Sequence, residues 1–208
     1  ICACLVGSEM CIRDRKWKEA SETSGLNPAE QEQAALYLNK VVKYLIVPEN
    51  AEIPAGLDKE VIVVRQPADH VYAGSNKTIS LMEELGQLDK VTTVGVKKNK
   101  CKNETIKEKM AEKEVDYAGT SGKLNYKKLV KSKCNLALLS SSVLPEKRSS
   151  KKAAKKKMTA YRKMTEKMTL LQIPVIVDRA KDEKGKDAQK EWEKVYQLIL
   201  ECDSQSAE

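Results

Sequence analysis

The stretch from residue 61 to residue 96 constrains the fold more than any other part of the chain. A β-branched run at 61–64 is followed by a polar loop at 72–76, a helix-period segment at 78–85 and a second short strand at 91–96. This order predicts a βαβ unit, and therefore a parallel sheet covered by helices. Ligands of open parallel sheets bind beyond the carboxyl ends of the strands. We therefore expect the loop at 72–76 to lie near a binding site.

The rest of the chain continues this alternation of strands and helices. Further strands are expected at 41–47, 136–139 and 175–177, and further helices at 103–113, 125–130 and 188–200. In the basic segment 146–168, Met158, Tyr161, Met164 and Met168 recur at spacings of three and four, which predicts a helix with this stripe facing the core. We therefore predict an α/β fold, a three-layer α-β-α lobe around a mainly parallel, Rossmann-like sheet of about five strands.

The composition fits one aliphatic domain. The chain has 208 residues, of which 41% are hydrophobic and none is Phe, so the core must be built from Val, Leu, Ile and Met. No apolar run reaches the ~18 residues that a membrane span needs. The net charge of +8 fits an anionic partner, or simply a lysine-rich solvated surface.

Motifs for catalysis or metal binding are not found. No two of the six cysteines are spaced C-x-x-C, and the single histidine, His70, leaves no Cys/His zinc set. There is no G-x-S-x-G sequence, no P-loop, and no G-x-G-x-x-G loop after the first strand. We expect His70 to be packed or hydrogen-bonded, and Cys134 to be a buried free thiol. The sequence therefore predicts no enzyme, no metal and no cofactor, and a Rossmann-type enzyme is the weakest function considered.

Five segments of the chain carry a resemblance to a known family. They are YLIVPENAEIPAGL at 44–57, the βαβ unit at 61–96, VDYAGTSGKLNYKKLVKSKCNLALLSS at 115–141, LQIPVIVDR at 171–179 and EWEKVYQLIL at 191–200. With these segments in this order, the chain resembles the substrate-binding proteins of ABC importers for iron-siderophores, haem and cobalamin. In that class, two lobes are joined by one long helix. The likeness covers most of residues 44–201 and implies a periplasmic-binding-protein-like lobe.

The resemblance also implies a division of the chain. Residues 41–187 would form the N-terminal substrate-binding lobe, and residues 188–208 would begin the bridging helix and end in a frayed tail. Residues 16–40 read as a polar leader that is partly helical. The string EMCIRDR at 9–15 matches a translated sequencing-library adapter, so we expect residues 1–15 to be a non-native scar, with a remnant of an export signal as the rival interpretation. The second lobe has no counterpart in this sequence.

The function implied by the resemblance is that of a monomeric extracytoplasmic protein, either a cell-surface lipoprotein or a periplasmic protein. It would bind a metal chelate such as an iron-siderophore, haem or corrinoid and deliver it to an ABC permease. Binding is expected to be noncovalent, and weak without the second lobe. Membrane contact is expected only through a lipid anchor absent from this chain, and nucleic acid is not a partner. The alternative is a basic nucleic-acid-binding α/β protein, suggested by the lysines of 147–167, although Tyr161 is the only aromatic residue in that run.

The loops that follow the strands hold the candidate ligand-binding residues. Glycine allows close backbone approach, hydroxyls form hydrogen bonds, and cations suit an anionic ligand. The candidates are Tyr72, Gly74, Ser75, Asn76, Lys97, Gly119, Thr120, Ser121, Ser140, Ser141 and Arg179. The alternative is that these are ordinary turn residues, since Gly, Ser and Asn dominate turns.

Two further assignments come from the resemblance. Members of the family dock onto the permease through exposed acidic residues, which suggests Glu83 and Glu84, with a solvated helix face as the alternative. A polar or basic residue facing the cleft is implied at Arg179, for which the alternative is a solvated arginine in a charged loop. The chain departs from the family at 180–190, where AKDEKGKDAQK stands in place of a Pro-Leu-Gly step and a short polar stretch.

Overall fold

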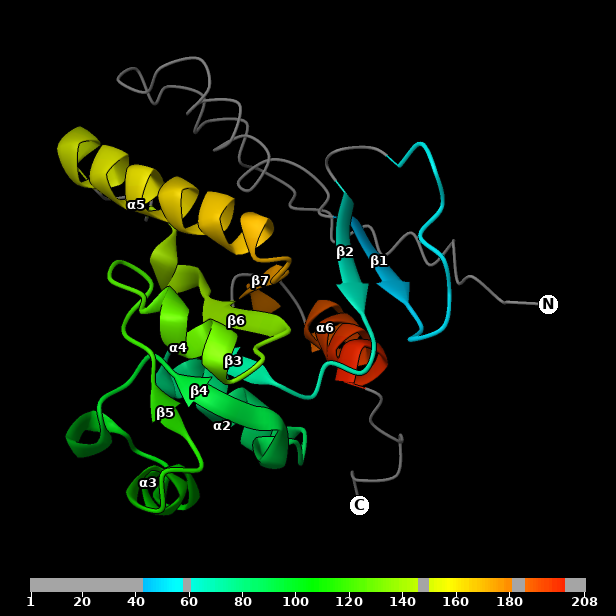
Figure 1. Cartoon of the computed structure of the whole chain (residues 1–208). Coiled ribbons are helices and arrows are strands. Elements are labelled where there is room, and N and C mark those ends of the chain that lie inside the picture. The colour runs from blue at the N-terminus through cyan, green and yellow to red at the C-terminus, as the bar shows by residue number, and fades with distance from the viewer. Residues whose placement is uncertain (1–42, 58–60, 146–149, 181–185, 201–208) are drawn as a thin grey trace.

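Five short strands form the central sheet of the computed structural model, which describes residues 43–57, 61–145, 150–180 and 186–200. The expected scar, the polar leader and the frayed tail lie outside the described residues. All neighbouring strands of the sheet are parallel, in the order β5-β4-β3-β6-β7 (Figure 1). The strands are β3 (Val71–Ala73), β4 (Val91–Val94), β5 (Asp116–Tyr117), β6 (Leu136–Ser140) and β7 (Val175–Asp178).

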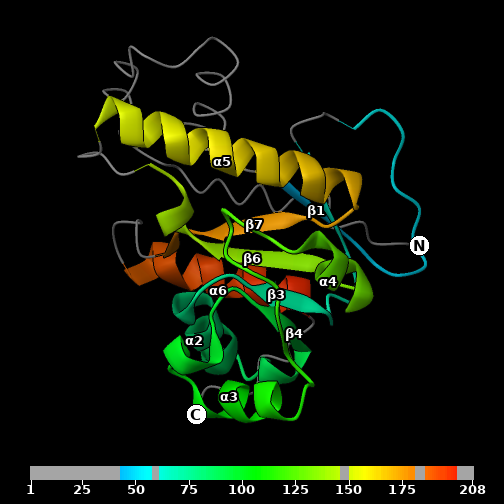
Figure 2. The same ribbon diagram turned by 60° about the vertical axis from the view of Figure 1, so that its left-hand side comes forward.

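In β3, β6 and β7, successive side chains enter two separate cores, one on each face of the sheet. In β6, Leu136 and Leu138 enter one core, whereas Ala137 and Leu139 enter the other. Figure 2 shows the sheet between α5 on one side and α2, α3 and α6 on the other. The predicted three-layer α/β fold with a parallel sheet is therefore confirmed. The helices are α2 (Asn76–Glu84), α3 (Glu104–Ala111), α4 (Tyr126–Lys131), α5 (Lys151–Leu170) and α6 (Lys186–Leu200), with 3₁₀ turns η2 (Leu88–Lys90), η3 (Lys98–Lys100) and η4 (Ser141–Val143).

Four of the helices begin at a side chain that accepts a hydrogen bond from the first turn. Ser75, Asn103, Asn125 and Ser150 cap α2, α3, α4 and α5 in this way. These residues are strong N-caps because their short side chains satisfy backbone N–H groups that have no partner within the helix. Among the described residues, no helix has both the length and the apolar character needed to cross a membrane.

The two longest helices each bury one face, and on α5 this is the stripe that the sequence periodicity predicted. On α5 the buried residues include Met158, Tyr161, Met164 and Met168. On α6 they are Trp192, Val195, Tyr196, Ile199 and Leu200. The aliphatic, methionine-filled core expected from a chain without Phe is thus observed on both faces of the sheet.

The assignment of residues 61–64 as the first strand of the βαβ unit was wrong. Residues 61–64 lie in β2 (Val61–Arg65), which pairs in parallel with β1 (Lys43–Val47) in a separate two-stranded sheet. The strand that precedes α2 is β3, within the stretch that we expected to be a loop. β3 has only three residues, too few for a periodic signal, and all three are buried. The second strand is also shorter than expected, because β4 ends at Val94.

The small sheet packs beside α6 (Figure 1). Val64 belongs to the core under α6, and the half-buried side chains of Tyr44, Ile46 and Ile62 pack against that core. The Gln66 side chain donates a hydrogen bond of 2.8 Å to the carbonyl of Leu198 in α6. A two-stranded sheet is marginally stable alone, so these contacts with α6 support it.

Candidate functional site at the carboxyl edge of the sheet

Because all five strands are parallel, their carboxyl ends meet at one edge of the sheet. The chain enters the sheet at β3, adds β4 and β5 on one side, and then returns to add β6 and β7 on the other. The strand order therefore reverses between β3 and β6. Ligands of open α/β sheets bind in the crevice outside such a switch point. The loops that begin at Gly74, Gly95, Ala118, Ser141 and Arg179 all start from this edge, as the sequence predicted.

Tyr72 is buried behind the carboxyl edge of the sheet and does not line that edge. It is a residue of β3, fully buried in the core beneath α4 and α5. Its hydroxyl donates a hydrogen bond of 2.8 Å to the carbonyl of Gly119, and burial raises the pKa of Tyr72 above its ordinary value. Tyr72 was predicted to lie in a ligand-binding loop, and this location was wrong because Tyr72 lies within strand β3. Its hydroxyl joins the end of β3 to the loop after β5.

Three glycines let the strand ends approach one another. A Cβ atom on Gly95 would overlap the carbonyl oxygen of Gly74 and lie 2.6 Å from the Tyr72 hydroxyl. Gly119 has a φ of +88°, and a Cβ there would overlap the carbonyl oxygen of Lys123. Gly74 and Gly119 were predicted as ligand-facing residues, and the structure gives both a role in packing the edge. Gly95 was missed, although its place directly after a strand, as at Gly74, was a usable signal.

The polar residues at the start of α2 are engaged by the protein itself. Ser75 and Thr78 form a reciprocal capping box, in which the Thr78 N–H donates to Ser75 Oγ and the Ser75 N–H donates to Thr78 Oγ1. The Asn76 side chain donates to the carbonyl of Lys100 at 3.0 Å and accepts from the N–H of Lys102 at 3.0 Å. Ser75 and Asn76 therefore fix the start of α2 against the loop that follows β4.

The remaining predicted residues differ in how open they are. Ser140 is the last residue of β6, is buried, and has its Oγ 2.6 Å from that of Ser142. Thr120 and Lys97 are exposed, whereas Ser121, Ser141 and Arg179 are half-buried. The edge thus presents hydroxyls and two cationic side chains around the switch point, which suits a polar or anionic group.

A carboxylate that sequence reasoning missed lies at the same edge. Asp178 ends β7, and its Oδ1 accepts hydrogen bonds from the Tyr196 hydroxyl at 2.9 Å and from the Ala180 N–H at 3.2 Å. Burial, together with this neighbouring carboxylate, raises the pKa of Tyr196 well above its ordinary value. These bonds connect α6 to the carboxyl edge.

Glu83 and Glu84 are not brought together with the other predicted residues. Both are exposed, in the last turn of α2. Since α2 begins at the carboxyl edge and runs away from it, these carboxylates lie about 10 Å from that edge along the helix axis. Their role in docking remains a prediction.

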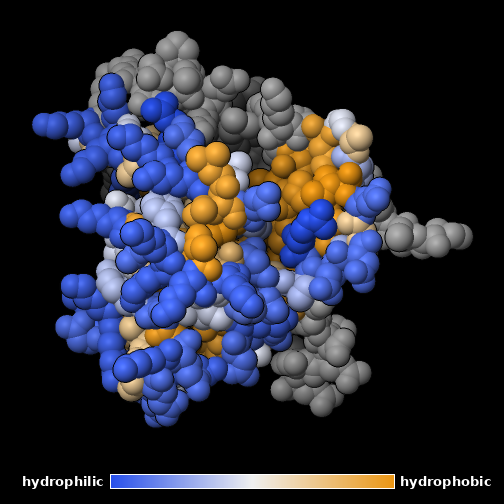
Figure 3. All heavy atoms as spheres, in the orientation of Figure 1, coloured by the Kyte–Doolittle hydropathy of each residue, from blue (hydrophilic) through white to orange (hydrophobic). Residues whose placement is uncertain are grey.

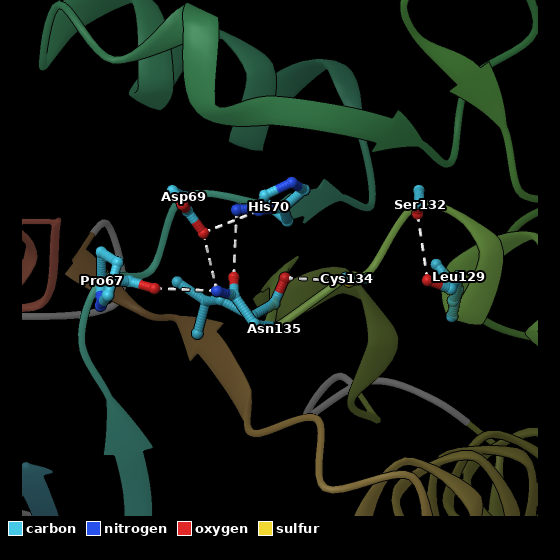
Figure 4. A network of polar contacts seen from close by, with 8 residues as sticks. Pro67, Asp69, His70, Leu129, Ser132, Cys134 and Asn135 are labelled. Carbon is cyan, nitrogen blue, oxygen red and sulfur yellow. Dashed lines mark hydrogen bonds and ion pairs between the residues drawn. The ribbon is translucent and has the colours of Figure 1, made fainter. Parts of the chain in front are cut away.

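The single histidine lies at the opposite edge, where the strands begin (Figure 4). His70 Nδ1 is 2.7 Å from Asp69 Oδ1, and the His70 N–H donates to Asn135 Oδ1 at 3.0 Å. The Asn135 amide donates to Asp69 Oδ1 at 2.9 Å and to the carbonyl of Pro67 at 2.8 Å. The expectation that His70 is hydrogen-bonded is confirmed. In the described part of the chain no three His, Cys, Asp or Glu side chains are grouped to hold a metal ion.

Comparison of the chain with protein-family models, with curated proteins and with solved structures gave no match. The carboxyl edge of the sheet is therefore the feature of the molecule that bears on its function.

Proposed function

We propose that this chain is the N-terminal lobe of an extracytoplasmic solute-binding component of an ABC importer. It would bind a metal chelate such as an iron-siderophore, haem or corrinoid and deliver it to the permease. The observation that carries the proposal is the switch point between β3 and β6, which is surrounded by hydroxyl and cationic side chains. The order of the five family-like segments supports the same conclusion.

The chemistry of the edge fits ligands of this class. Many metal chelates present carboxylate, phosphate or carbonyl oxygens at their periphery, and these accept hydrogen bonds from hydroxyls and ammonium groups. Lys97 and Thr120 are exposed at the edge, and Ser141 follows β6 directly at the switch point. Binding would be noncovalent. In a two-lobe protein each lobe supplies only part of the contacts, so the affinity of this lobe alone is expected to be weak.

The test is a titration of the isotope-labelled chain followed by amide NMR, which detects weak binding. The probes are a gallium-loaded trihydroxamate siderophore, gallium protoporphyrin and cyanocobalamin. We expect one of them to shift the amides of Gly74, Gly95, Gly119 and Ser141, and to leave the amides of the opposite edge unchanged.

A matched pair of charge reversals sharpens the test. Lys97→Glu should weaken the binding of an anionic probe at least about tenfold, because it places a like charge at the site. Lys131→Glu, an exposed lysine in the last turn of α4, changes the net charge equally and should have no effect. No shifts with any of the three probes, or shifts confined to the network around Asn135, would refute the proposal.

A further inference from the structure

The outer face of α5 carries a continuous stripe of lysines. Met158, Tyr161, Met164 and Met168 turn one face of this 20-residue helix into the core. The opposite face is solvent-exposed. Its exposed lysines are Lys152, Lys155, Lys156, Lys163 and Lys167. Spacings of four, seven and four residues place most of them on one side of the helix, so their charges point in a common direction.

The stripe ends at exposed apolar side chains. Leu170 is 83% exposed and Leu171 is 37% exposed, and Leu170 lies three residues after Lys167 at the end of the helix. Val130 on α4 is also exposed, at 56%. Figure 3 shows orange surface at this end of α5, bordered by blue lysine-rich surface. Exposed apolar side chains that gather next to a charged surface can mark an interaction site.

A groove runs along the same helix. It has a volume of about 890 Å³ and lies between α5 and residues 121–126. Lys156, Lys163 and Lys167 line it together with Lys123, and among the described residues of its wall Glu166 is the only acidic one. Lys167 Nζ lies 5.0 Å from the centre of the Tyr126 ring, which holds that ammonium group in place. The groove therefore adds to the cationic character of the stripe.

We propose that this face of α5 lies on an anionic phospholipid bilayer. Lysines attract anionic headgroups, and an apolar side chain beside them can enter the boundary between headgroups and acyl chains. A helix of 20 residues is about 30 Å long, which gives the stripe room for several headgroups at once. This would be a membrane contact of the folded lobe itself, in addition to the lipid anchor implied by the family resemblance.

Nucleic acid is the competing partner for a lysine stripe, and the structure disfavours it. Single strands bind on aromatic side chains that stack with bases. Tyr161, the only aromatic residue of α5, is buried in the core and cannot serve as such a platform. The half-buried ring of Tyr126 in the groove already lies beneath the ammonium group of Lys167. An exposed leucine at the end of the stripe gains little from phosphate contacts but gains from a lipid boundary. The proposal does not depend on which solute the carboxyl edge binds.

The experiment is co-sedimentation of the chain with vesicles. One set contains about 30% phosphatidylglycerol in phosphatidylcholine, and the other contains phosphatidylcholine alone. We expect binding only to the anionic vesicles at ~50 mM salt, and most of it lost at ~500 mM salt, because the shorter Debye length screens the lysines.

Two variants locate the contact. Lys152→Glu/Lys156→Glu/Lys163→Glu should reduce the affinity at least about 100-fold, since each lysine near an anionic surface contributes about a fivefold factor. Leu170→Ser should reduce it by about tenfold through loss of the apolar contact. The matched control is Lys98→Glu/Lys100→Glu/Lys102→Glu, which changes the net charge equally at three exposed lysines away from α5.

Three results would overturn the proposal. They are no binding to anionic vesicles, an equal loss in the control triple variant, and tight binding to duplex DNA together with indifference to vesicles. Circular dichroism of each variant establishes that it is folded, so that lost binding reports the surface. Because no solute is present, a negative result leaves the proposed transport function standing, and the NMR titration tests that function separately.

Discussion

At the scale of single residues, the carboxyl edge serves two purposes at once. Gly74 and Gly119 were predicted because glycine lets a ligand approach the backbone, yet the protein itself occupies the space. A Cβ at Gly119 would overlap the carbonyl oxygen of Lys123, and a Cβ at Gly74 would lie 2.6 Å from a methyl group of Leu139. At Gly119, where φ is +88°, glycine is required whether or not a ligand binds. Sequence reasoning singled out these positions, but it could not distinguish a glycine that admits a ligand from one that admits a neighbouring part of the chain.

Gly95→Ala is expected to destabilise the fold by about 1–3 kcal/mol, because the added methyl overlaps backbone that cannot move freely. Urea unfolding measures the change. Gly122→Ala is the matched control, since a Cβ at Gly122 would meet nothing within 4 Å. It should change stability by less than about 0.5 kcal/mol. If the two variants were equally stable, the proposed close packing of the β3 and β4 ends would be wrong.

At the scale of elements, long helices were predicted from the sequence more successfully than short strands. The period of α5 and α6 extends over several turns; both helices were predicted, and α5 buries the predicted stripe. β3 and the two-residue β5 were missed, because so few residues cannot display an alternating pattern. Conversely, 61–64 has the strongest β-branched pattern, yet it pairs with β1 outside the main sheet. Local propensity predicted that this run is a strand but not which partner it chooses.

Met164→Ala should cost about 2–5 kcal/mol, because it leaves a cavity between α5 and the sheet. The neighbouring exposed residue offers a control, since Lys163→Ala removes a side chain of similar length from the opposite face of α5. That change should be nearly neutral in the same thermal or urea unfolding measurement. A small effect of Met164→Ala would mean that α5 is only loosely attached to the sheet.

At the scale of the whole molecule, the strand order was beyond sequence reasoning. The alternation of strands and helices implied a parallel sheet, but nothing local specifies that the chain returns from β5 across β4 and β3 to place β6 next to β3. That return creates the switch point. The edge opposite to it is fastened by contacts distant in sequence, since Asn135 bonds to Pro67, Asp69 and His70.

This network should make part of the stability depend on pH. Burial alone would raise the pKa of Asp69, but hydrogen bonds from His70 and Asn135 and the charge of His70 together hold it below its ordinary value of 3.8. A carboxyl whose pKa is lowered by folding stabilises the fold above its unfolded-state pKa. That contribution is lost as the pH falls through the lower, folded-state value.

Asp69→Asn should therefore be less stable than the parent at pH 7, and the difference should shrink below about pH 4. Because the Asp69 side chain is 43% exposed, solvent screening limits the difference to about 1 kcal/mol. Urea unfolding at both pH values measures it. A difference that stayed constant with pH would show that the charge of Asp69 contributes nothing.

Each of the two cores contains one buried cysteine, which a thiol reagent can probe. Cys101 lies in the core that α6 covers, and Cys134 lies in the core beneath α4 and α5. Burial raises the pKa of the Cys134 thiol to about 11, so almost none of it is thiolate at neutral pH. Alkylating reagents attack thiolate, and the sulfur therefore stays inert while its layer is closed. With the other four cysteines replaced by serine, the rates of alkylation at these two sulfurs would report separately how often each helical layer opens.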